Sequence, residues 1–304
     1  MPTRPRSTPR SAPGCTRKRP PGIAQIPVAP PAPGPGRRRW WRSRWTPETV
    51  RGAIDAQGVW VHLLSAATHG EQLVLGQVEV GAKTGEIGQF APLLGGLAAA
   101  GVDLSHAVIT ADALHTQRAH AEYLHSVGAQ FVLTVKAEPA PPVRRPRRAA
   151  WANTPITHRE VEHGHGRVTT RTIQVLPAPP CLPFPHLNQV WLIERYVHDH
   201  TGALMSSVAA LGVTSLTAPP AGPANITTLI RQHWGIESLH WLRDTVYRED
   251  NSTPRTGSGP HVMAALRNLT IGAIHLLGRR DITEATRRAT RVMDRPFKIL
   301  QLTP

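Results

Sequence analysis

Between residues 59 and 136 the sequence alternates β-branched runs with helical stretches, and this order constrains the fold more than any other feature. The runs VWVHLLSAA and EQLVLGQVEV, separated by the turn-forming THG, predict an antiparallel hairpin. A helix, the strand HAVITAD, a second helix and the strand AQFVLTVK follow. The order β-β-α-β-α-β indicates an α/β sheet, and the helix between the last two strands favours their parallel pairing.

The sequence changes in character after this region. The stretch AEPAPPVRRPRR is typical of a linker, and it is followed by hairpin material with turns at HGHG and DHTG. We therefore expect a β-rich insertion over residues 137–226. Three helical stretches follow, and apolar positions in the second predict its packing face: Val262, Ala265, Leu266, Leu269, Ile271 and Ile274.

The basic charge is unevenly distributed. The formal net charge is +15, but residues 1–45 hold 11 Lys or Arg and no acidic residue, which leaves the remainder near +4. The same segment contains 11 prolines and no apolar period, so we expect a disordered basic tail. A nucleic-acid-binding arm is the alternative, because arginines interleaved with Trp40, Trp41 and Trp45 could follow a backbone and stack on bases.

Cysteine content and hydropathy limit the cellular setting. Cys15 and Cys181 are too few and too far apart for a disulfide framework or a thiolate zinc site. The sequence contains no apolar run of about 18 residues and no apolar signal-peptide core. We expect a cytoplasmic protein without a membrane partner.

Asp112 and Glu237 are the candidate metal ligands. Asp112 closes a buried strand at the carboxyl edge of the sheet, where ligands collect in open α/β folds. Glu237 lies in RQHWGIESLHWLRDTVYRED, a helix on which His233, Glu237, His240 and Asp244 fall within about 60° of one another. Their carboxylate oxygens suit Mg²⁺, and two such ions about 3.5–4 Å apart would support phosphoryl transfer.

Each candidate has a plainer interpretation. Asp112 could cap the following helix, and Glu237 could be an exposed residue paired with Arg231 or Arg243. A zinc site of the form His-x3-Glu-x2-His departs from the metalloprotease helix pattern, so we regard it as a distant alternative.

Several ordered motifs resemble the bacterial insertion-sequence DDE transposases that include the H-repeat-associated proteins. They are VITADALHTQ, FVLTVKAEP, HGRVTTRTI, LGVTSL, IRQHWGIESLHWLRDTVYRED and RTGSGPHVMAALRNLTIG, within residues 46–304. The resemblance implies an α/β, RNase H-like mixed sheet flanked by helices, with a β-rich insertion before the last catalytic helix. It also implies Mg²⁺, or Mn²⁺ in its place, and transposon-end and target DNA as partners of a homo-oligomer.

The resemblance assigns roles to individual residues. Asp112 corresponds to the second Asp of the family's catalytic triad and Glu237 to its Glu, which makes both metal ligands. We expect three residues of the same helix to be neighbours of the metal site: His233, His240 and Asp244. We expect DNA to be contacted by Lys136, Arg167 and Arg231. The expected divisions are a tail over 1–45, the first part of the catalytic domain over 46–136, the insertion over 137–226 and the completing helices over 227–304.

The first Asp of the triad is missing. Where the family has Asp-Gly-Lys, this chain has Thr46, Pro47 and Glu48, and the pattern resumes at Thr49. A Pro/Arg-rich stretch also replaces the family's helical amino-terminal domain, so we interpret the chain as amino-terminally degraded, by a frameshift or a start in the wrong frame. We expect cleavage and strand transfer to be lost or weakened, unless Glu48 or Asp55 substitutes.

Overall fold

Among the residues that the structure describes, nine strands form one mixed sheet in the order β3-β2-β1-β4-β5-β9-β8-β7-β6. The computed structural model describes residues 41–54, 60–81, 85–135, 151–180, 182–218 and 222–300. The strands are β1 (Trp41–Ile54), β2 (Trp60–Thr68), β3 (Val74–Val80), β4 (Ala107–Ala111), β5 (Gln130–Val135), β6 (His158–Gly164), β7 (Arg167–Pro177), β8 (Gln189–Asp199) and β9 (Leu204–Thr214).

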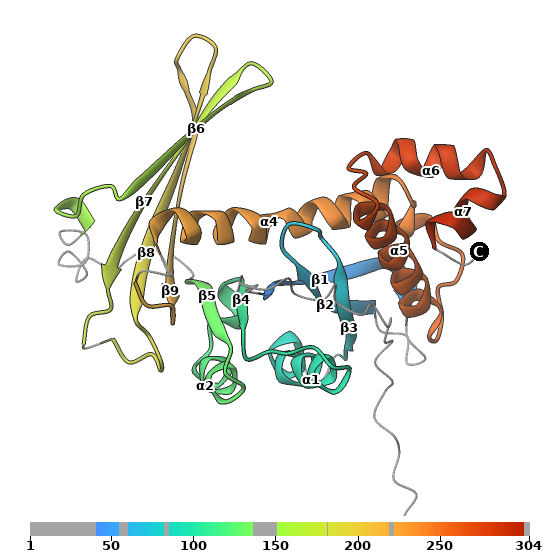
Figure 1. Ribbon diagram of the computed structural model, residues 1–304, viewed down its shortest axis with the longest axis horizontal. Coiled ribbons are helices and arrows are strands. Elements are labelled where there is room, and N and C mark those ends of the chain that lie inside the picture. The colour runs from blue at the N-terminus through green and yellow to red at the C-terminus, as the bar shows by residue number, and fades with distance from the viewer. Residues whose placement is uncertain are drawn as a thin grey trace, which may run out of the picture.

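Helices cover both faces of the sheet. They are α1 (Gly85–Ala99), η1 (Ala113–His115), α2 (Arg118–Ser126), α4 (Pro223–Thr245), η3 (Glu249–Asn251), α5 (Gly259–Leu276), α6 (Ile282–Thr290) and α7 (Asp294–Ile299). The helices α1 and α2 lie on one face, whereas α4 crosses the other face toward α5 (Figure 1). The sheet is therefore the middle layer of three.

The core divides along these layers. Beneath the sheet, Phe90 and Leu94 of α1 pack with Leu124 of α2 and with strand residues such as Ile109. Above it, the first half of α4 packs against β4, β5 and the later strands, with Val108, Val132, Ile173, Trp191, Ile193, Leu216, Ile226, Leu229 and Ile230 in one cluster. Neighbouring residues of β4 thus point to opposite layers, as strand alternation requires.

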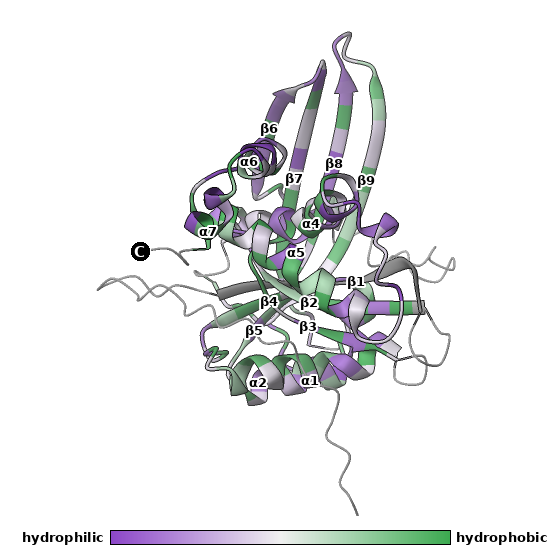
Figure 2. Ribbon diagram, turned by 90° about the vertical axis from the view of Figure 1, so that its right-hand side faces the viewer, coloured by the Kyte–Doolittle hydropathy of each residue, from purple (hydrophilic) through white to green (hydrophobic). Residues whose placement is uncertain are grey.

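The strands β6–β9, here called the ribbon, continue the same sheet through antiparallel pairing of β9 with β5. They project beyond the helical layers, with hydrophilic and hydrophobic residues alternating along them (Figures 1 and 2). Where the ribbon joins the body, Gly212 lies against the Trp191 ring, and a Cβ at position 212 would be 1.9 Å from Trp191 Cζ2. A residue without a side chain is needed for this close approach.

The expected fold class is confirmed: an α/β, RNase H-like mixed sheet flanked by helices, with a β-rich insertion before α4. The antiparallel hairpin of β2 and β3 and the parallel pairing of β4 with β5 are confirmed as well. The helix expected after Asp112 is instead broken into η1 and α2, because Gln117 adopts an extended backbone conformation.

Two further expectations need correction. On α5, Val262 and Leu266 are exposed, whereas Arg267 and Asn268 are buried because they pair with Glu249 and Gln77. The strand β1 begins at Trp41, so residues 41–45 lie in the sheet rather than in the basic tail.

The rest of the basic tail and the expected linker are not described by the structure. Residues 1–40 and 136–150 lie outside the described residues, and the expected domain divisions stay predictions. Within the part of the chain that the structure describes, no helix combines the length and apolar character needed to cross a bilayer.

Candidate functional site

Asp112 follows the last residue of β4, at the carboxyl edge of the parallel strands. Its Oδ1 accepts hydrogen bonds from the backbone N–H groups of Leu114, at 3.0 Å, and His115, at 3.4 Å. The capping role that the sequence left open is therefore present. Because Oδ2 has no hydrogen-bond partner among the described residues, capping leaves half of the carboxylate available.

The register of β1 places the position of the missing Asp beside Asp112. Trp45 of β1 is the parallel partner of Ala111 in β4, and continuing that register by one residue sets Thr46 next to Asp112. Glu48 is two positions further along β1 and is opposite Leu63 of β2. Asp55 lies outside the described residues.

A buried hydrogen-bonded group joins α4 to the sheet near this edge. The Thr110 hydroxyl of β4 lies 3.1 Å from Nδ1 of His233 in α4 and 2.8 Å from Nε2 of His69, which follows β2. All three side chains are buried. One hydroxyl can donate only once, so at least one of the two histidine nitrogens must itself donate to it. Neither Thr110 nor His69 stood out in the sequence.

The four polar residues that the sequence aligns along one side of α4 differ in their exposure to solvent. His233 is buried and His240 half-buried, whereas Glu237 and Asp244 are exposed. The carbonyl oxygen of Gly235 accepts a hydrogen bond from Gln72 Nε2 at 3.4 Å. Glu237 lies about 160° around the helix from Gly235, so it is on the side of α4 turned away from Gln72.

Glu86 is a further carboxylate near Asp112 that the sequence analysis missed. It lies in the first turn of α1 and lines an open pocket of about 430 Å³ together with His62 and Leu114. Burial raises the pKa of Glu86, the negative charge of Asp112 raises it further, and the charge of His62 opposes them. Its sequence context, KTGEIGQF, carried no signal of this proximity.

The type of donor fits a divalent metal, but the number of donors does not. Carboxylate oxygens of Asp112 and Glu237 are suitable ligands for Mg²⁺. Yet the described side chains contain no group of three or more His, Cys, Asp or Glu that could hold a metal ion. The same finding leaves the His-x3-Glu-x2-His zinc arrangement without support, since His233 instead contacts Thr110.

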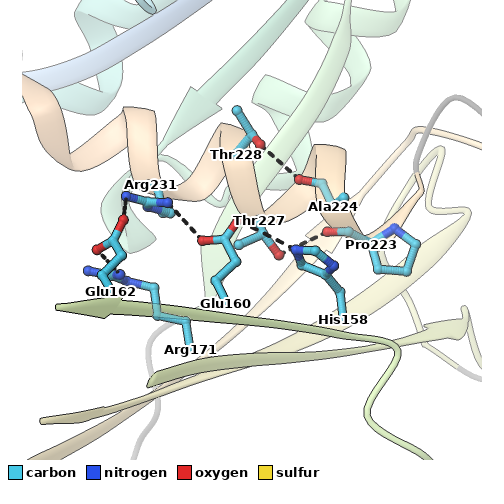
Figure 3. Close-up of polar contacts among 9 residues, drawn as sticks. All are labelled: His158, Glu160, Glu162, Arg171, Pro223, Ala224, Thr227, Thr228 and Arg231. Carbon is cyan, nitrogen blue, oxygen red and sulfur yellow. Dashed lines mark hydrogen bonds and ion pairs between the residues drawn. The ribbon is translucent and has the colours of Figure 1, made fainter. Parts of the chain in front are cut away.

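Arg231, a predicted DNA contact, is engaged within the protein. Its Nη1 lies 2.8 Å from Glu160 Oε2, and its Nη2 pairs with Glu162, which Arg171 also contacts at 2.6 Å (Figure 3). The alternative pairing of Glu237 with Arg231 or Arg243 is not formed, because Arg243 pairs with Glu249.

Of the two other predicted DNA contacts, Arg167 lies within the described residues. Arg167 is exposed at the start of β7, next to the tight turn between β6 and β7. Lys136 lies outside the described residues.

Comparison with known proteins gives a consistent match. The family model described as "Transposase DDE domain" matches residues 47–271. The chain is 25% identical over 236 residues to the "H repeat-associated putative transposase YhhI" of Escherichia coli (strain K12), covering 70% of this chain and 58% of that protein. It is 27% identical over 245 residues to the "Putative transposase YncI" of Escherichia coli O157:H7, covering 75% and 60% respectively.

The chain spans less than two thirds of the length of these curated relatives. Among solved structures, a piggyBac transposase synaptic complex with hairpin DNA matches with 11% sequence identity and a TM-score of 0.39. That match covers 77% of this chain and 45% of that one. A TM-score at this level supports no conclusion about function.

Proposed function

The chain belongs to the transposase DDE domain family, and on that premise we propose that it is a DNA-binding transposase domain whose metal-dependent DNA cleavage and strand transfer are impaired. Its partners in this proposal are transposon ends and target DNA, engaged by a homo-oligomer. Mg²⁺, or Mn²⁺ in its place, is the cofactor that the family implies.

The relation of α4 to β4 supports Asp112 and Glu237 as the two remaining metal ligands. Thr110 of β4 and His233 of α4 are in contact. Asp112 lies about 7 Å beyond Thr110 along the strand, and Glu237 lies about 6 Å beyond His233 along the helix. Glu237 lies on the side of α4 away from Gln72, which is next to the opposite edge of the sheet. This arrangement supports the proposal that both carboxylates lie at the carboxyl edge of β4. His240 and Asp244 are proposed neighbours, and His233 holds the helix in place.

The register of β1 against β4 is the observation that carries the proposed impairment. It sets Thr46 beside Asp112, where the family has its first carboxylate. Threonine is neutral and a weak ligand, so only two of the family's three carboxylate positions still carry a carboxylate, where two divalent ions need more. Glu48 is two positions away along the strand and does not occupy the matching place in the register.

Restoring the missing carboxylate tests the proposal. We expect the unmodified chain to show no Mg²⁺- or Mn²⁺-dependent cleavage of its own element's ends, and Thr46→Asp to restore measurable cleavage. In the Thr46→Asp background, Asp112→Asn and Glu237→Gln should abolish it, whereas Glu284→Gln, an exposed residue of α6, should not. Efficient cleavage by the unmodified chain would overturn the proposed impairment.

A second candidate, a nucleic-acid-binding protein that uses residues 1–45 as an arm, has less support. Trp41 and Trp45 belong to β1, which pairs with strands on both sides, so this part of the arm is committed to the sheet. Deleting residues 1–40 separates the two functions. DNA affinity should persist if the folded body binds DNA and should collapse if the arm does.

A further inference from the structure

The side of the ribbon that faces α4 changes from apolar to cationic along its length. Near the body, Ile173 of β7 and Ile193 of β8 are direct cross-strand partners, and both pack with residues of α4. Two residues further toward the tip, the direct cross-strand pair on this face is Arg171 and Arg195. We call the surface formed by Arg171, Arg195 and Arg231 the arginine face.

The pairing of Arg171 with Arg195 is unfavourable on its own. Like charges directly opposite each other on neighbouring strands destabilise a sheet. Glu160 is the cross-strand partner of Arg171 on its other side, but the Arg195 side chain has no hydrogen bond or ion pair with any described residue. Its Nε is nevertheless buried. Such an arrangement is suited to an anion that the protein itself does not supply.

The other two arginines are held by carboxylates of β6. Glu160 and Glu162 contact Arg231, and Glu162 also contacts Arg171 (Figure 3). The Arg171 hydrogen bond lowers the pKa of Glu162, so that carboxylate stays ionised at neutral pH. Arg171 is 15% exposed and Glu160 23%, whereas Arg231 is 37% exposed and Glu162 44%, so solvent and other solutes reach the Arg231–Glu162 pair most readily. Exposed pairs of this kind contribute about 0–1 kcal/mol and can be exchanged for other partners.

We propose that the arginine face binds the phosphate backbone of duplex DNA through Arg171, Arg195 and Arg231. Glu160 and Glu162 occupy Arg171 and Arg231 while DNA is absent, and phosphate oxygens replace them on binding. Three guanidinium groups against two carboxylates leave one positive charge on this surface to attract DNA. The inference rests on the proposed function, because it takes DNA as the partner, and it adds Arg171, Arg195 and the competing carboxylates to the interface.

The test measures binding of the full chain to a fluorescently labelled duplex over a series of salt concentrations. Arg195→Gln should lower affinity about 5- to 10-fold and reduce the slope of log K against log salt by about 1, as loss of one phosphate contact does. Arg195→Lys, which keeps the charge, should retain most of the affinity. The matched control is Arg159→Gln, since Arg159 is exposed on the opposite face of β6 and should change affinity by less than about twofold.

Substitution of a carboxylate provides a second test, which does not depend on Arg195. Glu162→Gln should raise affinity several-fold, because it frees Arg171 and Arg231 as well as removing a negative charge. Glu284→Gln makes the same charge change on α6, where Glu284 pairs with Arg288, and should have little effect.

The possible outcomes distinguish this inference from the proposed function. If the unmodified chain binds the duplex but Arg195→Gln and Glu162→Gln behave like their controls, the arginine face is wrong and the proposed function stands. If the unmodified chain shows no salt-dependent duplex binding, both are wrong. A gain of affinity for Glu162→Gln with a loss for Arg195→Gln supports the inference.

Discussion

The Thr110 hydroxyl in β4 lies 3.1 Å from Nδ1 of His233 in α4, and this buried contact joins the strand that ends at Asp112 to the helix that carries Glu237. His69 Nε2 shares the same hydroxyl at 2.8 Å. Three segments far apart in the sequence therefore meet at one oxygen atom. The position of α4 over the sheet depends on this group as well as on apolar packing.

Thr110→Val should destabilise the protein by about 2–4 kcal/mol. The substitution keeps the shape of the side chain but deprives two buried ring nitrogens, His69 Nε2 and His233 Nδ1, of this partner. Thr110→Ser retains the hydroxyl and should cost less than half as much. Urea denaturation of the three proteins measures the difference, and equal midpoints for the two variants would show that the hydroxyl is unimportant.

Glu249→Gln should cost about 3–5 kcal/mol of folding stability. Glu249 is 1% exposed and lies 2.5 Å from Arg243 and 3.0 Å from Arg267, so removal of its charge takes away the carboxylate that both buried guanidinium groups contact. Glu284→Gln, which breaks an exposed pair, should stay within about 1 kcal/mol. Similar denaturation midpoints for both variants would contradict the role given to this cluster.

Stability should fall as the pH drops below about 6.5, in part because of His115. Burial lowers the pKa of His115 to about 4, the charge of His120 adds to the effect and that of Asp112 opposes it. A histidine whose folded pKa is depressed binds its proton more readily when unfolded, so acid favours unfolding. The loss assigned to His115 is about 2 kcal/mol between pH 7 and pH 5.

His115→Phe tests that assignment, because an aromatic ring in this position can keep the ring contacts with Phe90 and His120. The variant should lose less stability than the unmodified chain between pH 7 and pH 5 in denaturant titrations. An unchanged pH dependence would show that other groups account for the acid sensitivity.

Gly212→Ala should disturb the junction of the ribbon and the body. A Cβ there would lie 1.9 Å from the fully buried Trp191 ring and 2.4 Å from the carbonyl oxygen of Leu133, which belongs to the strand paired with β9. We expect a loss of about 3 kcal/mol or more. Gly95→Ala in α1 is the matched control, because its nearest neighbour would be 3.8 Å away and alanine favours the helix by about 0.5–1 kcal/mol.

Local patterns in the sequence determined the element order and predicted the two residues proposed as metal ligands. Alternating and helical periodicities depend on neighbouring residues alone, so β2, β3, β4, β5 and α1 were predictable from short windows. Asp112 at a strand end and Glu237 on a helix followed from the same windows, and the ordered motifs predicted the family. The start of β1 at Trp41 was missed, because a Pro/Arg-rich composition concealed a strand that its neighbours β2 and β4 hold in place.

Only the tertiary structure decided which of these polar side chains meet. Whether Arg231 contacts solvent or Glu160, 71 residues earlier in the chain, depends on how the ribbon curves over α4. Whether His233 contacts Thr110 depends on where α4 crosses β4. Periodicity defines the face of an element but not the element that the face will meet, because that choice is made by long-range packing of the whole sheet.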